Sequence, residues 1–435
     1  MRNILIIFSL LLSTIAYSQE TATQLSLQEA INYALENNRT VKNAALDIDA
    51  AIKQKWETTA TGLPQLSAAV DYQNALKRNV FVFGDQIIQV GSRHTLTGTA
   101  TLSQLLFDGS YLVGLQSAKV YLEISKNAKT KTDLEVRKAV INAYGNVLLA
   151  EESISILNRN ITVLDKNLNE VTKIFENGLE EEESVEQLKI TLSSVKSRLN
   201  NTTRLRDLAY QMLNLTIGKP INDKTVLTED LDALTLQNIK LEVLDTDNNV
   251  ENNIDYKIAE NDKTAKELLV KLEKSKALPS LSAFINGAYT GNRESFNFTN
   301  TQEKWFGSSI FGVSLNVPIF SSGMRSAATQ RAAINLEKAE INLTETEEML
   351  NLQVNAAKSD YQFAIEDYQN KKDNLTLAER IEQKNQTKFF EGIGSSFDLR
   401  QAQTQLYTAQ QELLQTMLDV ITKKAELDTL LNTTN

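Results

Sequence analysis

Apolar residues recur with a seven-residue period over long parts of this chain. In each of three series, the members are spaced alternately by three and four residues. The series are Leu157, Ile161, Leu164, Leu168, Val171 and Phe175; Val185, Leu188, Leu192, Val195 and Leu199; and Leu399, Ala402, Leu406, Ala409 and Leu413. A strict seven-residue repeat indicates helices that supercoil around one another along an apolar seam. The pattern therefore predicts long, paired α-helices.

The four prolines leave room for these helices. None lies between residues 65 and 219 or after residue 318. Because proline lacks an N–H and clashes with the preceding helical turn, it is excluded from helix interiors. Residues 110–174 and 324–388 are each predicted to form one unbroken helix about 100 Å long, at about 1.5 Å per residue.

Two similar interruptions follow these helices. FENGLEEEESVEQL spans residues 175–188, and FFEGIGSSFDLRQA spans residues 389–402. Each has a glycine three residues after a phenylalanine, then polar residues, and then a new seven-residue series. Segments 175–184 and 389–398 are therefore predicted to be the tips of two long antiparallel helical hairpins.

The chain repeats itself with an offset of 213 to 215 residues. The matching stretches are NNRTVK at 37 and NNIDYK at 252, GLPQLSAAVDY at 62 and ALPSLSAFINGAY at 277, and QLLFDGS at 104 and VPIFSSG at 317. Such self-similarity indicates one supersecondary arrangement encoded twice. We predict a first repeat over 19–218, a connector over 219–250 that is polar and lies outside the duplication, and a second repeat over 251–435.

Each repeat also carries two pieces in which apolar and polar residues alternate. The residues that define one face of each are Leu66, Ala68, Val70 and Tyr72; Thr97, Thr99, Thr101 and Ser103; Leu281, Ala283, Ile285 and Tyr289; and Phe311, Val313, Leu315, Val317 and Ile319. Segments of about ten residues with one apolar face are typical of transmembrane β-barrel strands. An ordinary half-buried sheet alternates in the same way. We favour the barrel over the half-buried sheet for two reasons. The chain is expected to be exported, and long polar loops follow the strands at 73–94 and 290–304.

The N-terminus supports export. An arginine precedes an apolar run from Ile4 to Ala16 and then small residues, a pattern typical of a secretory signal peptide over 1–18 with cleavage after Ser18. A membrane anchor is the alternative, but the run is shorter than the roughly 20 residues that a spanning helix needs. Since four strands are too few to close a barrel, and lipid does not tolerate open sheet edges, the chain is expected to pool its strands with copies of itself.

Composition narrows the possible functions. The net charge of −10 argues against a nucleic-acid partner, which requires a basic face. The chain has no cysteine and a single histidine, His94, in a predicted loop. No metal-ligand cluster, phosphate-binding glycine loop or nucleophile motif is present in the sequence, so neither an enzyme nor a cofactor is expected.

These features together resemble the TolC family of outer membrane efflux ducts. The resemblance covers about residues 25–431 and rests on SLQEAINYALENNRTVK at 26, the LPQLS and LPSLS strand starts, the LFDG turn and the repeated F-x-x-G tip. Arg39 replaces the proline that usually follows the double asparagine. The resemblance implies a mainly α chain with a transmembrane β portion: two helical hairpins and four strands. Three copies would form a twelve-stranded barrel in the outer membrane of a Gram-negative bacterium and an α-helical tunnel through the periplasm.

The resemblance also implies functional positions at the tips. Acidic residues beyond the second tip line the pore constriction in this family, and Asp398 occupies that place, with Gln401 where some members have a second acid. The equivalent place after the first tip has Ser184 between Glu183 and Glu186. Alternatively, the run of glutamates is a solvated turn at a helix start, where negative charge interacts favourably with the helix dipole.

Partners follow from the same resemblance. Gly178, Leu179, Gly392 and Ile393 match the positions where a periplasmic adaptor is thought to dock. The expected function is a passive exit duct, joined by the adaptor to an inner-membrane pump of RND, ABC or MFS type. A secreted or surface-associated coiled-coil structural protein is the alternative. It explains the helices but gives no role to the four alternating strands.

Overall fold

The computed structural model describes residues 23–245, 249–300 and 302–432. The signal peptide expected at 1–18 lies outside these residues. The chain divides into two compact units. The first contains the described residues up to Ala45 together with Ala128–Tyr256 and the described part of Thr346–Asn435, and the second contains Leu46–Asn127 and the described part of Lys257–Glu345.

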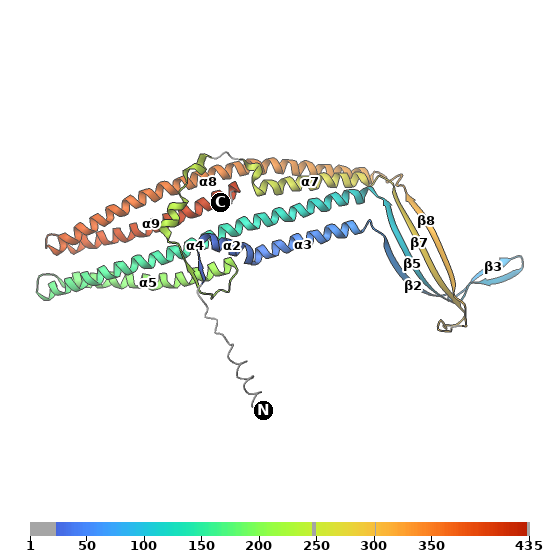
Figure 1. Cartoon of the computed structure of the whole chain (residues 1–435), viewed down its shortest axis with the longest axis horizontal. Helices are drawn as coiled ribbons and strands as arrows, with labels where there is room; N and C mark the ends of the chain where they lie inside the picture. Colours follow the sequence, from blue (N-terminus) through green and yellow to red (C-terminus); the bar gives the residue numbers. More distant parts are fainter. Residues whose placement is uncertain (1–22, 246–248, 301, 433–435) are drawn as a thin grey trace, which may run out of the picture. The chain divides into compact units, whose positions relative to one another are not determined.

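The long helices predicted from the proline distribution are confirmed. Helix α4 runs without a break over Gly109–Glu176, and α8 runs over Met324–Phe390. Helix α5, Glu182–Ile217, returns beside the end of α4, and α9, Ser396–Leu431, returns beside α8. Figure 1 shows the two hairpins, with α4 and α5 in green and α8 and α9 in orange and red.

The apolar seams also lie where the seven-residue period places them. Leu164 of α4 is fully buried against Leu192 and Val195 of α5. Lys196 of α5 adds an ion pair to Asp165 of α4, with its Nζ 3.3 Å from Oδ1. Because exposed ion pairs contribute little, the seam side chains supply most of the packing energy.

The larger core of the first unit lies where the short helices meet the long ones. Strand β1, Thr23–Leu25, pairs in parallel with β6, Thr225–Leu227. Helix α2, Leu27–Asn37, and helix α6, Leu231–Asn238, pack their buried residues into the same core as Tyr144 and Tyr361 of the long helices. Two short 3-10 helices, Leu241–Asp245 and Val250–Asn252, complete the segment between the repeats.

The segment 219–250 was expected to be a polar connector, but it contributes apolar side chains to the core. Leu231 and Leu234 are buried on one face of α6, and Thr225 is buried in β6. The surrounding aspartate, lysine and asparagine residues hide this short apolar face in the sequence. The boundaries 19–218, 219–250 and 251–435 remain a prediction.

An asparagine caps the start of one shorter helix in each repeat. Asn38 Oδ1 accepts hydrogen bonds from the main-chain N–H groups of Thr40 and Val41, and its Nδ2 donates to the Thr216 carbonyl. These bonds mark the break between α2 and α3, Arg39–Ala60. Arg39 stands at this break in place of the usual proline. In the second repeat, Asn253 accepts from the N–H of Asp255 and donates to the Leu430 carbonyl at the start of α7, Ile254–Ser275.

The second unit contains a four-stranded antiparallel sheet. Its strands are β2 (Gln65–Asn74), β5 (His94–Phe107), β7 (Ser280–Arg293) and β8 (Phe306–Asn316), in the spatial order β2-β5-β7-β8. All four predicted strands are present, but β8 ends at Asn316, so Val317 and Ile319, which were expected to continue the fourth strand, lie beyond it. The neighbouring strands β5 and β7 belong to different repeats, so the sheet joins the two halves of the chain (Figure 1).

One of the two polar loops is not a loop throughout. Residues 73–94 contain a β-hairpin made of β3, Asn79–Phe83, and β4, Gln86–Val90. The sequence-based expectation failed because apolar residues occupy both faces of these strands, so no alternation marks them. His94, expected in the same loop, is instead the first residue of β5. The loop 290–304, in contrast, begins inside β7 and has no further strand among its described residues.

Among the described residues, no helix is both long and apolar enough to cross a bilayer.

Candidate functional site

The two hairpin tips have the same backbone geometry. Gly178 and Gly392 both have a φ of +73°. In the first tip the N–H of Gly178 donates to the Phe175 carbonyl and that of Leu179 to the Ile174 carbonyl. In the second tip, the N–H of Gly392 donates to Phe389 and that of Ile393 to Lys388. Both are Schellman motifs, which end a helix at a residue in the left-handed conformation, usually glycine.

The residue after each glycine exposes an apolar side chain. Leu179 is 78% exposed and Ile393 is 72% exposed. No atom lies within 4 Å of the position that a Cβ would take on Gly178 or Gly392. Each tip therefore presents one exposed apolar side chain on a turn with free space around its glycine. Such a surface is suited to contact with another molecule.

The acidic residues beyond the first tip differ in exposure. Glu183 and Glu186 are exposed at the start of α5, where a negative charge favours the helix dipole. Ser184 is only 4% exposed, and its hydroxyl donates a 2.6 Å hydrogen bond to Glu180 Oε1. Ser184 thus faces the packed interior and positions the Glu180 carboxylate.

Beyond the second tip, Asp398 has a defined local role. Ser395 is the N-cap of α9, and its hydroxyl accepts from the N–H of Asp398 while donating to the Asp398 carboxylate at 2.7 Å. These bonds fix the Asp398 side chain at the surface of the tip. Gln401 is also exposed, one helical turn further on.

The two tips are held together by a small apolar cluster. Val171 and Val185 of the first hairpin pack with Phe389 and Leu399 of the second, and we call these four residues the tip cluster. Phe389 is buried in it, whereas the equivalent Phe175 is partly exposed. The duplication is therefore broken at the tip, because one phenylalanine packs between the hairpins and the other does not.

Polar contacts fix the register of the two hairpins away from the tips. Gln386 Nε2 of α8 donates to Asn167 Oδ1 of α4 at 3.0 Å, and Asn160 Nδ2 of α4 donates to Gln410 Oε1 of α9 at 2.8 Å. Side-chain amides between packed helices are satisfied in only one axial alignment. They therefore specify how far one hairpin lies along the other.

The sheet of the second unit has one apolar and one polar face. Leu66, Val70, Ile285 and Val313 share one face with aligned glycine, alanine and leucine residues of the neighbouring strands. The opposite face is mainly polar: it carries Asp71 and the pair Thr97 and Thr290, whose hydroxyls are 3.1 Å apart, although Phe284 and Ile310 also lie on it. No described strand pairs with the outer edge of β2 or β8. A sheet with these faces can separate lipid from water only if other strands cover its two edges.

A family model described as outer membrane efflux protein matches residues 30–219 and 247–433. This chain belongs to that family. The matched segments cover both repeats and include the tips, the sheet and all four long helices.

Individual relatives agree with this membership. The probable efflux pump outer membrane protein TtgC of Pseudomonas putida is 22% identical over 413 residues, which cover 92% of this chain and 82% of the relative. Outer membrane protein TolC of Vibrio cholerae is 24% identical over 310 residues, which cover 71% of this chain and 68% of the relative.

Solved structures share the fold. CusC superposes with a TM-score of 0.76 at 19% identity, covering 93% of this chain and 91% of that chain. The outer membrane protein VceC of Vibrio cholerae gives a TM-score of 0.73 at 15% identity, covering 93% and 95%. The efflux-family architecture is thus retained although few residues are identical.

The sequence did not point to Arg400, which lies between the two expected pore positions Asp398 and Gln401. Its guanidinium carbon is 5.5 Å from the centre of the Phe397 ring, a cation–π arrangement. Arg400 therefore adds a positive charge beside Gln401, within the first two turns of α9. The signal for it was present as the sequence DLRQ, but a lone arginine on a helix is usually a solvated residue.

A half-buried acid of α8, Glu382, also faces α9. Burial raises the pKa of Glu382, and the nearby amide of Gln403 lowers that pKa only in part. Gln403 is itself buried and its amide makes no hydrogen bond of good geometry, so it does not compensate for the lost hydration of the carboxylate. Burial likewise raises the pKa of Tyr407, and the charge of Glu382 adds to this effect.

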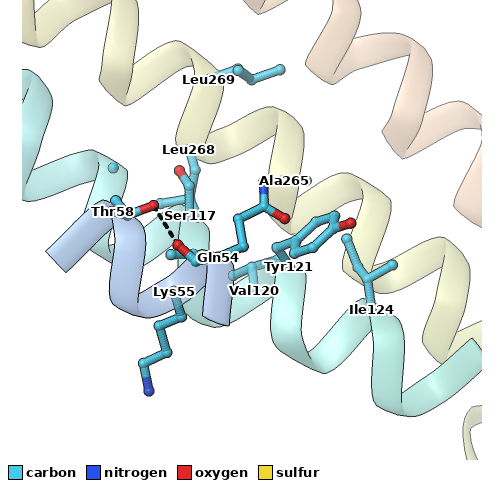
Figure 2. Close-up of a pocket in the computed structure, with 12 residues that line it drawn as sticks. Gln54, Lys55, Thr58, Ser117, Val120, Tyr121, Ile124, Ala265, Leu268 and Leu269 are labelled. Carbon is cyan, nitrogen blue, oxygen red and sulfur yellow. Dashed lines mark hydrogen bonds between the residues drawn. The ribbon is translucent and has the colours of Figure 1, made fainter. Parts of the chain in front are cut away.

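The second unit contains a cavity of about 370 Å³ between α3, α4 and α7. Val120, Ile124 and Leu268 contribute to its mainly apolar lining. Figure 2 shows the Lys55 side chain extending away from the other lining residues, and the Thr58 hydroxyl bonded to the Gln54 carbonyl within α3. Its lining residues include no carboxylate and no histidine.

Proposed function

We propose that three copies of this chain form an exit duct in the outer membrane. Their twelve strands would close a barrel, and their long helices would form a tunnel into the periplasm. The duct would passively export substrates that an inner-membrane pump delivers through a periplasmic adaptor. The observation that carries the proposal is the four-stranded sheet with one apolar face and two uncovered edges, in a chain of the outer membrane efflux protein family.

Pooling of strands follows from the strand count, and three copies is the number that the resemblance to the TolC family implies. Transmembrane barrels need about eight strands or more, and closure must leave no edge in lipid. Pairing β8 of one copy with β2 of the next would satisfy both edges in antiparallel fashion. The names of TtgC and TolC place those relatives in the outer membrane, which supports the same location for this sheet.

The tips are proposed to form the narrowest part of the tunnel. Asp398, Gln401, Glu183 and Glu186 would then line the axis in three copies each, with Ser184 supporting the ring through Glu180. Rings of carboxylates favour cations and repel anions in narrow pores. The exposed position of these four side chains supports this role.

The adaptor is proposed to dock at the tips. Leu179 and Ile393 supply exposed apolar side chains, and Gly178 and Gly392 leave space beside them for a closely approaching backbone. The alternative function, a coiled-coil structural protein outside the membrane, is less favoured because it gives no role to the apolar face of the sheet.

The experiment that tests the duct uses the full chain purified in detergent. Native mass spectrometry should give a trimer, and insertion of that trimer into planar bilayers should give discrete, cation-selective conductance. A monodisperse monomer that retains its sheet content would contradict the proposal. So would a trimer that never conducts, even with the tip acids removed.

A further inference from the structure

The hairpin formed by β3 and β4 is unusual in being apolar on both faces. Phe81, Phe83, Ile88 and Val90 lie on one face, and Val80, Val82 and Ile87 lie on the other. All seven are exposed. Asp85, in the turn, is the only charged residue between Asn79 and Val90.

The base of the hairpin is fixed rather than loosely tethered. The N–H of Ala75 donates to the Arg93 carbonyl at 2.8 Å, which joins the two connecting segments. Arg78 forms a two-pronged contact with Glu294, with Nη2 2.8 Å from Oε2 and Nη1 3.2 Å from Oε1. A bidentate arginine–carboxylate pair fixes direction as well as distance, so the hairpin leaves the end of the sheet in a set direction.

Neither water nor lipid suits this hairpin. A two-stranded hairpin is at best marginally stable in water, and exposed apolar strands with free edges associate with other strands. Lipid would accept the side chains, but it cannot hydrogen-bond the main-chain groups along the outer edges of β3 and β4. The partner that satisfies the edges is another β-strand, and a closed ring of such strands also buries the apolar face that turns inward.

We propose that the hairpins of three copies of this chain pair edge to edge. In this arrangement β3 of one copy lies antiparallel to β4 of the next, and three such contacts close a six-stranded collar beyond the membrane sheet. The proposal rests on the proposed trimer, because a three-fold axis brings the three hairpins to the same end of the assembly. Closure by a ring is also the arrangement that leaves no strand edge unpaired.

The pairing of β3 with β4 indicates which main-chain groups face the neighbour. The hairpin closes through the two-residue loop Gly84–Asp85, so the flanking pair Phe83 and Gln86 is of the hydrogen-bonded kind. Pairs alternate along an antiparallel ladder, so the next pair, Val82 and Ile87, directs its N–H and C=O groups outward. Val82 is therefore a position where the edge can be altered without loss of the hairpin's own bonds.

The test uses Gln89→Cys in the full-length protein, which has no native cysteine. Equivalent positions in the collar lie about 10 Å apart, since two strand spacings of about 4.8 Å separate them. A short bismaleimide should therefore join the copies into covalent dimers and trimers. Native mass spectrometry of the same sample reports whether the uncross-linked particle is a trimer.

Two further variants in the Gln89→Cys background test the edge contact itself. Val82→Pro removes the outward N–H and should lower the covalent trimer by about fivefold or more, because an edge that lacks its donor cannot pair. Val82→Thr keeps the N–H and a similar shape, and should cross-link as well as the parent.

Four outcomes would overturn the collar. A trimer without cross-links, or equal cross-linking of the Pro and Thr variants, would mean that the hairpins do not pair by their edges. Brominated lipid that quenches a fluorophore attached to the thiol of the Gln89→Cys variant would instead place the hairpin in the membrane. Failure to form a trimer at all would overturn both this inference and the duct.

Discussion

At the scale of single residues, the tips depend on two glycines. Ala at Gly178 or Gly392 would place a Cβ on a backbone with φ of +73°, which costs about 1–2 kcal/mol for an L-residue. We expect Gly178→Ala and Gly392→Ala each to destabilise their tip by about this amount, measured by hydrogen exchange of the tip amides. Gly114→Ala is the control. It has an ordinary helical backbone, and its Cβ would meet only Thr58 Cγ2 at 3.8 Å, so stability should be unchanged or higher.

Ion preference at the tips is also set by single charges. Asp398→Ala combined with Glu183→Ala should move the reversal potential in planar bilayers toward zero, because the carboxylate ring loses two of its three acidic positions per copy. Arg400→Ala should have the opposite effect and increase cation preference. Asp71→Ala, on the polar face of β2, is the control and should change little. Unchanged selectivity in the double variant would mean that these acids are solvated residues at a helix start and do not line the pore.

At the scale of elements, the seam of the first hairpin can be tested directly. Leu164→Asp would bury an unpaired charge at a position with no solvent exposure, at a cost of several kcal/mol. We expect a marked fall in assembled protein and in the temperature at which the assembly dissociates. Thr162→Asp, on the exposed side of the same helix, should assemble normally. Normal assembly of both would show that the seam does not determine hairpin packing.

The contact between α8 and α9 should respond to pH through Glu382. Because burial raises the folded-state pKa of this carboxyl, its contribution is most favourable below the unfolded pKa of about 4.3 and is lost as pH rises through the folded pKa. Glu382→Gln should therefore raise the unfolding temperature at mildly alkaline pH and have little effect in acid. Glu379→Gln, at an exposed position on the same helix, is the matched control.

The elements differ in how far the sequence revealed them. The absence of proline and the seven-residue period were sufficient for α4, α5, α8 and α9, because both reflect constraints within the helix pair. The β3–β4 hairpin was missed because strands that are apolar on both faces show no alternation. The candidate pore residues were found only through resemblance. Their arrangement depends on other copies of the chain, about which the periodicity of one copy contains no information.

At the scale of the whole molecule, the two faces of the sheet should differ in tolerance to charge. Val313→Lys places a charge on the apolar face of β8 and should destabilise the membrane-inserted protein by about 2–4 kcal/mol if the site is near the bilayer midplane. Ser314→Lys, its neighbour on the polar face, should be nearly neutral. Heat-dissociation of the trimer on gels gives the comparison. Equal effects would argue against a lipid-facing side.

The continuous seam of each hairpin also restricts which changes of helix length the protein can accept during evolution. An insertion preserves the seam only if it adds whole seven-residue units to both helices of a hairpin, and each unit adds about 10.5 Å. Since the turn is specified locally by its glycine, it would be unaffected by such an insertion. Ducts of this design can therefore adapt to a wider or narrower periplasm in discrete steps, provided that both hairpins change together.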